Sequence, residues 1–136
     1  MYELFDHTAD LGLRVESPDL PGLFREAAEG LFSVIVAEIP CRAPLREVRI
    51  RVEAERTDYL LLDWLHELLY LFETERLLLG GFEVEIQDTR LAATARAWSV
   101  DETRDALLHE VKAVTYHRLR VEQTERGFLA EMILDI

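Results

Sequence analysis

VKAVTYH, residues 111–117, and MILDI, residues 132–136, are the two ends of the stretch that decides the fold. Each belongs to an apolar-rich run, and the polar turn between the runs, Thr124 to Gly127, contains one glycine. Two such runs joined by a short turn are typical of a β-hairpin. The sequence therefore predicts that the last element of the fold is a hairpin.

The turn also sets the expected pairing of the two strands, because turn length fixes hairpin register. It places Leu119 opposite Met132 and His117 opposite Leu134. Side chains alternate between the two faces of a strand. The second strand is therefore expected to present one apolar face, with Asp135 on the other.

Charged groups gather at the open end of this hairpin. The chain ends on Asp135 and the main-chain carboxylate of Ile136, and two carboxylates this close repel unless a cation or a proton lies between them. Lys112 is the only lysine among 15 basic residues. A lysine ammonium is a compact point charge that titrates when partly buried, which arginine cannot do. Lys112 is thus a functional candidate, with a chance replacement of arginine as the plain alternative.

Length and composition indicate a single domain over residues 1–136. Apolar residues make up 49% and charged residues 31%, as in ordinary globular proteins. No apolar run approaches the roughly 20 residues that span a bilayer, and no secretory signal precedes the first strand. Cys41 is the only cysteine and suits a reducing compartment. We therefore expect a cytoplasmic protein without a membrane segment.

The charge balance narrows the class of partner. With 27 acidic and 15 basic residues the net charge is −12. Such a surface repels phosphate backbones, so direct binding of RNA or DNA is not expected. A basic protein partner or a bound cation is favoured, although solubility alone explains much of the charge.

The remaining sequence predicts two helices and further strands. Asp19 caps the first helix, with Pro21 in its first turn, and the helix ends before Pro40. Thr57 or Asp58 caps the second, and Gly80-Gly81 ends it. Alternating apolar residues predict strands at 2–6, 11–16, 48–54, 82–86 and 91–98.

This order of elements predicts an α+β fold, with two helices packed on one face of a mixed, mostly antiparallel sheet. The first two strands are joined through His7-Thr8-Ala9-Asp10, and a turn at 88–90 joins two later strands. Residues 101–110 fit either a short helix or a loop.

Candidate functional residues come from both ends of the chain and meet only if the first strands lie beside the last. They are His7, Asp10, Lys112, Tyr116, His117, Asp135 and Ile136. The oxygen donors of Asp10, Asp135 and the Ile136 carboxyl group suit Ca²⁺ or Mg²⁺, with water completing the shell. No zinc spacing is present. The plain alternatives are that Asp10 is a turn former and that each histidine is a hydrogen-bonded strand residue.

Familiar catalytic signatures are absent from the sequence. There is no phosphate-binding glycine loop, HExxH helix, nucleophile elbow or CxxC pair. An acid–base site built from His117, Lys112 and Asp10 remains an alternative. Nothing in the sequence indicates its substrate.

Four motifs together resemble the archease family over the whole chain. They are HTAD at 7–10, LLLDWLHELLY at 60–70, VKAVTYH at 111–117 and LDI at 134–136. The resemblance implies a small cytoplasmic accessory protein that is not itself an enzyme. Its implied partner is the RNA-splicing ligase that joins a 3′-phosphate or 2′,3′-cyclic phosphate end to a 5′-hydroxyl with GTP and Mn²⁺. The accessory protein would promote guanylylation and multiple turnover of that ligase. Archeases are also linked to a tRNA cytosine methyltransferase as chaperone-like modulators.

The resemblance also assigns residues. The metal ligands of the family fall on Asp10, Asp135 and the carboxyl group of Ile136, and its lysine falls on Lys112.

Two positions depart from the family pattern. Ala97-Trp98 replaces Gly-Glu, and Asp105 replaces a histidine. These changes suggest an altered activity or partner, and an exposed Trp98 would be a contact surface.

Overall fold

Apolar stripes on two helices hold the structure together. A computed structural model describes residues 1–7 and 10–136, and two helices and seven strands lie within them. The helices are α1 (Leu20–Ile35) and α2 (Thr57–Glu75). The strands are β1 (Tyr2–His7), β2 (Asp10–Ser17), β3 (Arg46–Glu53), β4 (Leu77–Gln87), β5 (Arg90–Ser99), β6 (Ala113–Thr124) and β7 (Gly127–Asp135).

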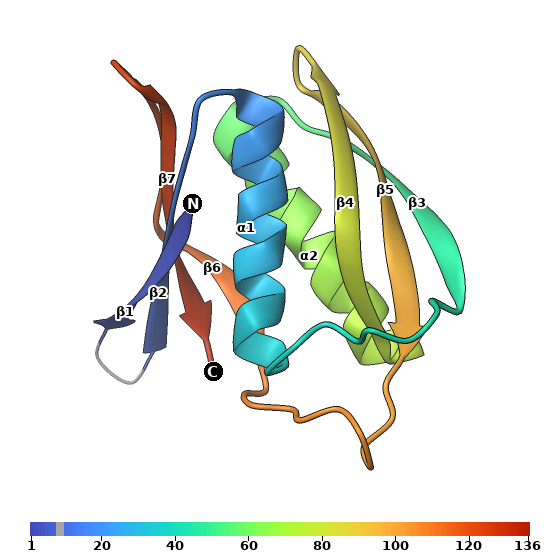
Figure 1. Cartoon of the computed structure of the whole chain (residues 1–136). Coiled ribbons are helices and arrows are strands. Elements are labelled where there is room, and N and C mark those ends of the chain that lie inside the picture. The colour runs from blue at the N-terminus through green and yellow to red at the C-terminus, as the bar shows by residue number, and fades with distance from the viewer. Residues whose placement is uncertain (8–9) are drawn as a thin grey trace.

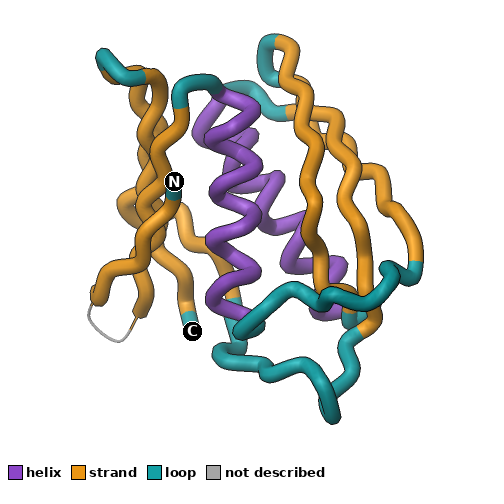
Figure 2. Tube along the Cα trace, in the orientation of Figure 1, coloured by secondary structure: helices purple, strands orange, loops and turns teal. Residues whose placement is uncertain are grey.

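The strands form two sheets with the helices between them (Figures 1 and 2). One sheet has the order β1-β2-β7-β6 and the other β3-β5-β4, and every pairing between these strands is antiparallel. The predicted α+β class is confirmed. The expected single sheet is instead two, because each helix is apolar over a wide enough arc to cover a sheet on either side.

Both helices bury their apolar sides in one continuous core. Trp64 of α2 is fully buried and its indole Nε1 donates a hydrogen bond to the carbonyl oxygen of Phe24 in α1, at 3.0 Å. Its ring also meets Phe82 of β4 edge to face, with centroids 6.0 Å apart. Neither helix of the described residues has the length and apolarity needed to cross a membrane.

The end of α2 differs from the expectation. The helix stops at Arg76, whose φ of 53° is left-handed and whose amide donates to the carbonyl of Phe72. Gly80 and Gly81 lie within β4, where the pairing with β5 shifts. The glycine pair therefore marks a β-bulge, which a positive φ of 60° at Gly81 permits, rather than a helix stop.

The terminal hairpin has the predicted turn but only half of the predicted register. Thr124 pairs with Gly127, and the pairing continues as far as Arg120 with Glu131. A bulge then inserts extra residues between Thr115 and Arg120, where Arg118 adopts a φ of 60°.

The bulge changes the partner of Leu134. Leu134 lies opposite Val114 rather than His117, and the pair of Leu119 with Met132 is not formed. The turn residues do not predict this change, because a β-bulge depends on the contacts that the strand makes with the rest of the fold.

Residues 101–110 form a loop rather than a helix. The loop lies against the C-terminal end of α1. The amide of Leu108 donates a hydrogen bond to the carbonyl oxygen of Ile35, and the amide of His109 donates one to the carbonyl oxygen of Val34. The last carbonyls of a helix lack partners inside the helix. The loop satisfies two of them, and its own backbone is fixed as a result.

The cap of α1 provides a test of the helix boundary. The Asp19 side chain accepts a hydrogen bond from the amide of Gly22 at 2.7 Å, as predicted from the sequence. We expect Asp19→Ala to lower the free energy of unfolding by about 1 kcal/mol, measured by urea denaturation. Asp63→Ala, on the exposed side of α2, is the control and should change stability little. Equal losses in both variants would contradict a capping role.

Candidate functional site

The strand order brings the two ends of the chain together. β2 pairs with β7, and their last paired residues are Leu11 and Leu134. One step further in the same register places Asp10 beside Asp135, at the end of the sheet where β1 ends and β2 begins (Figure 1). The expectation that the first strands lie beside the last is therefore confirmed.

Lys112 and Ile136 lie at the same end of the sheet. The amide of Lys112 donates a hydrogen bond to the carbonyl oxygen of Asp135 at 2.7 Å, and the Lys112 side chain is exposed. The Ile136 side chain packs against the core, which holds its carboxyl group at the end of β7. We call Asp10, Lys112, Asp135 and Ile136 the strand-end cluster.

Two histidines border this cluster. The rings of His7 and His117 have centroids 5.9 Å apart, although their strands are the two outer strands of the sheet. The β6 bulge makes this contact possible. His7 Nδ1 is buried without a hydrogen-bond partner among the described residues, and lies 3.9 Å from Asp10 Oδ2. Thr8 and Ala9, the middle of the HTAD motif, lie outside the described residues.

Tyr116 lies apart from the strand-end cluster, because the bulge directs it toward α2. Its hydroxyl oxygen accepts a hydrogen bond from Arg56 Nη2 at 3.0 Å, and its ring stacks on Tyr59 with centroids 5.4 Å apart. His66 of α2 bonds the same strand, with Nε2 2.6 Å from the Val114 carbonyl oxygen. The sequence analysis missed these contacts, since they join residues far apart in the chain.

The chemistry of the cluster fits a hard cation. Within residues 1–7 and 10–136, no three His, Cys, Asp or Glu side chains form a metal-binding group. The donors present are two side-chain carboxylates and one main-chain carboxyl group. In the described part of the chain, neither Asp135 nor Ile136 has an ion-pair partner. Such a set suits Ca²⁺ or Mg²⁺, which accept oxygen donors and water in the same shell.

Trp98, one of the two departures from the family pattern, is only 5% exposed. Its indole Nε1 donates to the carbonyl oxygen of Arg42 at 2.8 Å. Trp98 is therefore not the contact surface that an exposed side chain would form, because the segment before β3 covers it.

Asp105, the other departure, is also buried, at 9% exposure. Arg42 donates two hydrogen bonds to its carboxylate, at 3.0 and 2.9 Å, and the amide of Asp101 donates a third at 2.8 Å. The Arg42 guanidinium holds the pKa of Asp105 below its ordinary value. Asp105 thus ties the 101–110 loop to the segment before β3.

The sequence of this chain matches the Archease protein family (MTH1598/TM1083) over residues 2–136. It belongs to the archease family. It is 34% identical to the archease of Archaeoglobus fulgidus over 136 residues, which cover 99% of this chain and 98% of the relative. Identity to the archease of Pyrococcus furiosus is 36% over 140 residues, with the same coverage of 99% and 98%.

Solved structures agree with the fold of this archease. Protein 1598 of Methanobacterium thermoautotrophicum superposes with a TM-score of 0.78 at 31% identity, covering 99% of this chain and 98% of that one. An archease of Thermotoga maritima, described as a possible chaperone, gives 0.69 at 18% identity, covering 100% and 98%. This second likeness concerns the fold alone.

The Arg42–Asp105 pair predicts a pH dependence of stability. A carboxyl group with a lowered pKa in the folded state stabilises the fold above its ordinary pKa of 3.8, and this stabilisation is lost as the pH falls below that value. We expect Asp105→Asn to be less stable at neutral pH and to lose stability less steeply below 3.8. Chemical denaturation between neutral and acid pH measures both effects.

Asp101 contributes to the acid sensitivity of both the wild type and Asp105→Asn in that experiment. The Thr103 hydroxyl and the Arg104 guanidinium lower its pKa to about 2, so the wild type and the variant share this acid-sensitive group. Asp63→Asn is the control for loss of an exposed carboxylate. Parallel acid curves for Asp105→Asn and the wild type would contradict the prediction.

Proposed function

We propose that this archease is a non-enzymatic, metal-binding accessory protein that activates an RNA-splicing ligase by promoting its guanylylation and turnover. The observation that carries the proposal is the meeting of Asp10, Asp135 and Ile136 at adjoining strand ends, next to Lys112. These residues come from opposite ends of the sequence, and β2–β7 pairing holds them together. Membership of the archease family supports the choice of partner.

Asp10, Asp135 and the Ile136 carboxyl group would hold the divalent ion, Ca²⁺ or Mg²⁺. When bound, the ion supplies positive charge that offsets the repulsion between these carboxylates. Lys112 adds an exposed point charge beside them. The carboxylates, set at strand ends, then offer a rigid acidic surface to a partner.

Docking of the strand-end cluster at the nucleotide site of the ligase would act through orientation and electrostatics. Groups fixed on strands keep their geometry without ordering cost when a partner binds, and this favours positioning of a reacting group. Lys112 places its charge where a phosphate or a nucleophilic group can meet it. His7 and His117, on the border of the cluster, are available to hydrogen-bond at the same surface.

The charge of the chain fits this partner. A net charge of −12 favours association with a basic, RNA-binding enzyme and disfavours direct contact with RNA. In this arrangement the ligase contacts the RNA and the archease contacts the ligase.

A chaperone-like action on a tRNA cytosine methyltransferase is the second candidate. The description of the Thermotoga maritima archease as a possible chaperone favours it. This function would reduce aggregation of the methyltransferase or alter its choice of site. It would not depend on Lys112, and this separates it from ligase activation.

The metal proposal predicts binding of Ca²⁺ or Mg²⁺ to the purified protein, measured by titration calorimetry. Asp10→Asn and Asp135→Asn should each weaken binding by about tenfold or more, because each removes a ligand charge. Two residues appended after Ile136 should have a similar effect, since they move the carboxyl group away. Asp88→Asn, in the β4–β5 turn, is the control. Unchanged binding in all three altered proteins would exclude the strand-end cluster as the site.

Ligase activation predicts a separate effect of Lys112. In a guanylylation assay, the wild type should stimulate the ligase, and Lys112→Ala should abolish most of the stimulation while binding metal normally. Lys112→Arg keeps the charge but not its geometry, and should restore stimulation only in part. Arg126→Ala, in the exposed β6–β7 turn, is the control. Full stimulation by Lys112→Ala would overturn the role assigned to this lysine.

A further inference from the structure

The outer face of the three-stranded sheet, which points away from the helices, carries two walls of opposite charge. Val48 and Ile50 of β3 are buried toward the helices, so the residues between and beyond them face outward. One wall is arginine on β3 and the other is glutamate on β4, with small residues on β5 between them. The arginine wall is Arg49 and Arg51, and the glutamate wall is Glu83 and Glu85. The small residues between them are Ala92 and Thr94.

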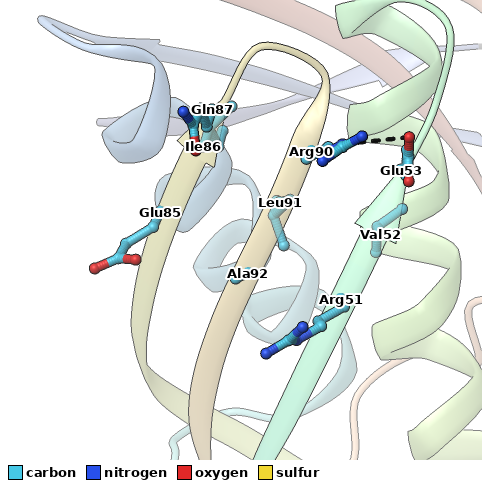
Figure 3. A pocket seen from close by; sticks show the side chains of 9 residues that line it. All are labelled: Arg51, Val52, Glu53, Glu85, Ile86, Gln87, Arg90, Leu91 and Ala92. Atoms are coloured by element: carbon cyan, nitrogen blue, oxygen red, sulfur yellow. Dashed lines mark ion pairs between the residues drawn. The ribbon is translucent and has the colours of Figure 1, made fainter.

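The register places these residues in rows across the sheet. Arg51 pairs with Ala92, which pairs with Glu85. In the same way, Arg49, Thr94 and Glu83 form the next row. Figure 3 shows the first row, with Arg51 and Glu85 on the two flanking strands and Ala92 between them. An open hollow of about 410 Å³ is lined by residues of both rows. We call the two rows the charged groove.

The walls are available to a partner. All four wall residues are exposed, and none forms an ion pair within the described ranges 1–7 and 10–136. Ion pairing on this face joins Arg90 to Glu53 at the rim, at 3.4 Å. The walls therefore keep their full charge for another molecule.

The face is electrically balanced, unlike the rest of the molecule. Its outward charged residues are four arginines and four glutamates, namely Arg49, Arg51, Arg90, Arg96, Glu47, Glu53, Glu83 and Glu85. The net charge of −12 thus belongs to other surfaces. A second copy is repelled less at this face than at a surface that carries the net negative charge.

We propose that the charged groove pairs with the same groove of a second copy, around a two-fold axis parallel to the strands that passes over β5. Under this symmetry Arg51 faces Glu85 of the second copy, and Arg49 faces Glu83 of the second copy. The register matches both rows at once. A two-fold interface is self-complementary, and each ion pair occurs twice.

The other in-plane axis, perpendicular to the strands, is excluded by charge, because it sets arginine against arginine and glutamate against glutamate. Facing sheets lie about 10 Å apart. Long arginine and glutamate side chains can bridge this distance while Ala92 and Thr94 leave the centre clear. Arg90 also lies near the axis, and Glu53 offsets its charge.

The extent of the interface is limited at one end. The segment before β3 crosses the opposite end of this face, where Trp98 bonds the Arg42 carbonyl and Gly80 lies against Ile39. Only the part around the two rows is open. The dimer is therefore small, polar and salt-sensitive, in the class of transient interfaces.

Sedimentation equilibrium of the full chain tests the proposal. The wild type should dimerise at about 0.1 M salt, where charges act over roughly 10 Å, because this distance spans the facing sheets while the repulsion between the two net charges of −12 is largely screened. It should dissociate at about 1 M, where charges act over roughly 3 Å. Arg51→Glu and Glu85→Arg should each raise the dimer dissociation constant about tenfold or more, because like charges then face each other. The double variant R51E/E85R reverses both walls of the row and should return to near the wild-type value.

Controls with the same charge changes lie in the exposed β6–β7 turn: Arg126→Glu and Glu125→Arg. They should leave the dissociation constant within about threefold of the wild type. A wild type that stays monomeric at about 0.1 M salt would overturn the proposal, even if another protein binds this face. So would a double variant no better than the single variants, or controls that weaken dimerisation equally.

Discussion

The antiparallel pairing of β2 with β7 is the constraint on which the structure depends. It joins the beginning of the chain to its end and gives the four-stranded sheet two central strands, whose inner side chains contact α1. Leu13, Ala130 and Met132 are fully buried there. A shift of one residue would turn these side chains outward and bring charged ones inward. The same register therefore fixes the core on one face and the neighbourhood of Asp10 and Asp135 at the strand ends.

The β6 bulge gives two consecutive residues different surroundings. Tyr116 joins Arg56 and Tyr59 at the start of α2, whereas His117 reaches the ring of His7 across the sheet. A regular strand also sends neighbours to opposite faces, but it would not carry His117 over two intervening strands. The bulge thus links the border of the strand-end cluster to the beginning of a helix.

Much of the fold could be predicted from the sequence, because its signals are local. Asp19 as a helix cap, the turn at Thr124 to Gly127 and the alternation in β3 each depend on neighbouring residues, and each occurs in the structure. The division into two sheets could not be predicted, since periodicity shows that a helix is apolar but not how many sheets it covers. Gly80-Gly81 was misinterpreted for a related reason, because glycine permits both a helix stop and a bulge.

The candidate site was predictable where it consists of chain ends and a rare residue. Asp10, Lys112 and Asp135 differ from their surroundings in the sequence itself. The β2–β7 pairing and the hydrogen bond from the Lys112 amide to Asp135 put all three at one end of the sheet, and their role as a site stays a prediction. Arg42 gave no such signal, because its partner Asp105 is 63 positions away. The charged groove was also hidden, since alternating charges on β3 and β4 are ordinary for exposed strand faces. The pairing register of the strands in the structure shows that the arginines and glutamates lie in common rows across the sheet.

The two tryptophans of the chain lie in separate environments, and this makes the protein its own spectroscopic reporter. Trp64 lies in the central core with its indole bonded to α1, while Trp98 is covered by the segment before β3 and bonded to Arg42. Emission from the first follows the melting of the whole molecule. Emission from the second shifts to the red as soon as that covering segment lifts, so each fluorophore isolates a different opening event.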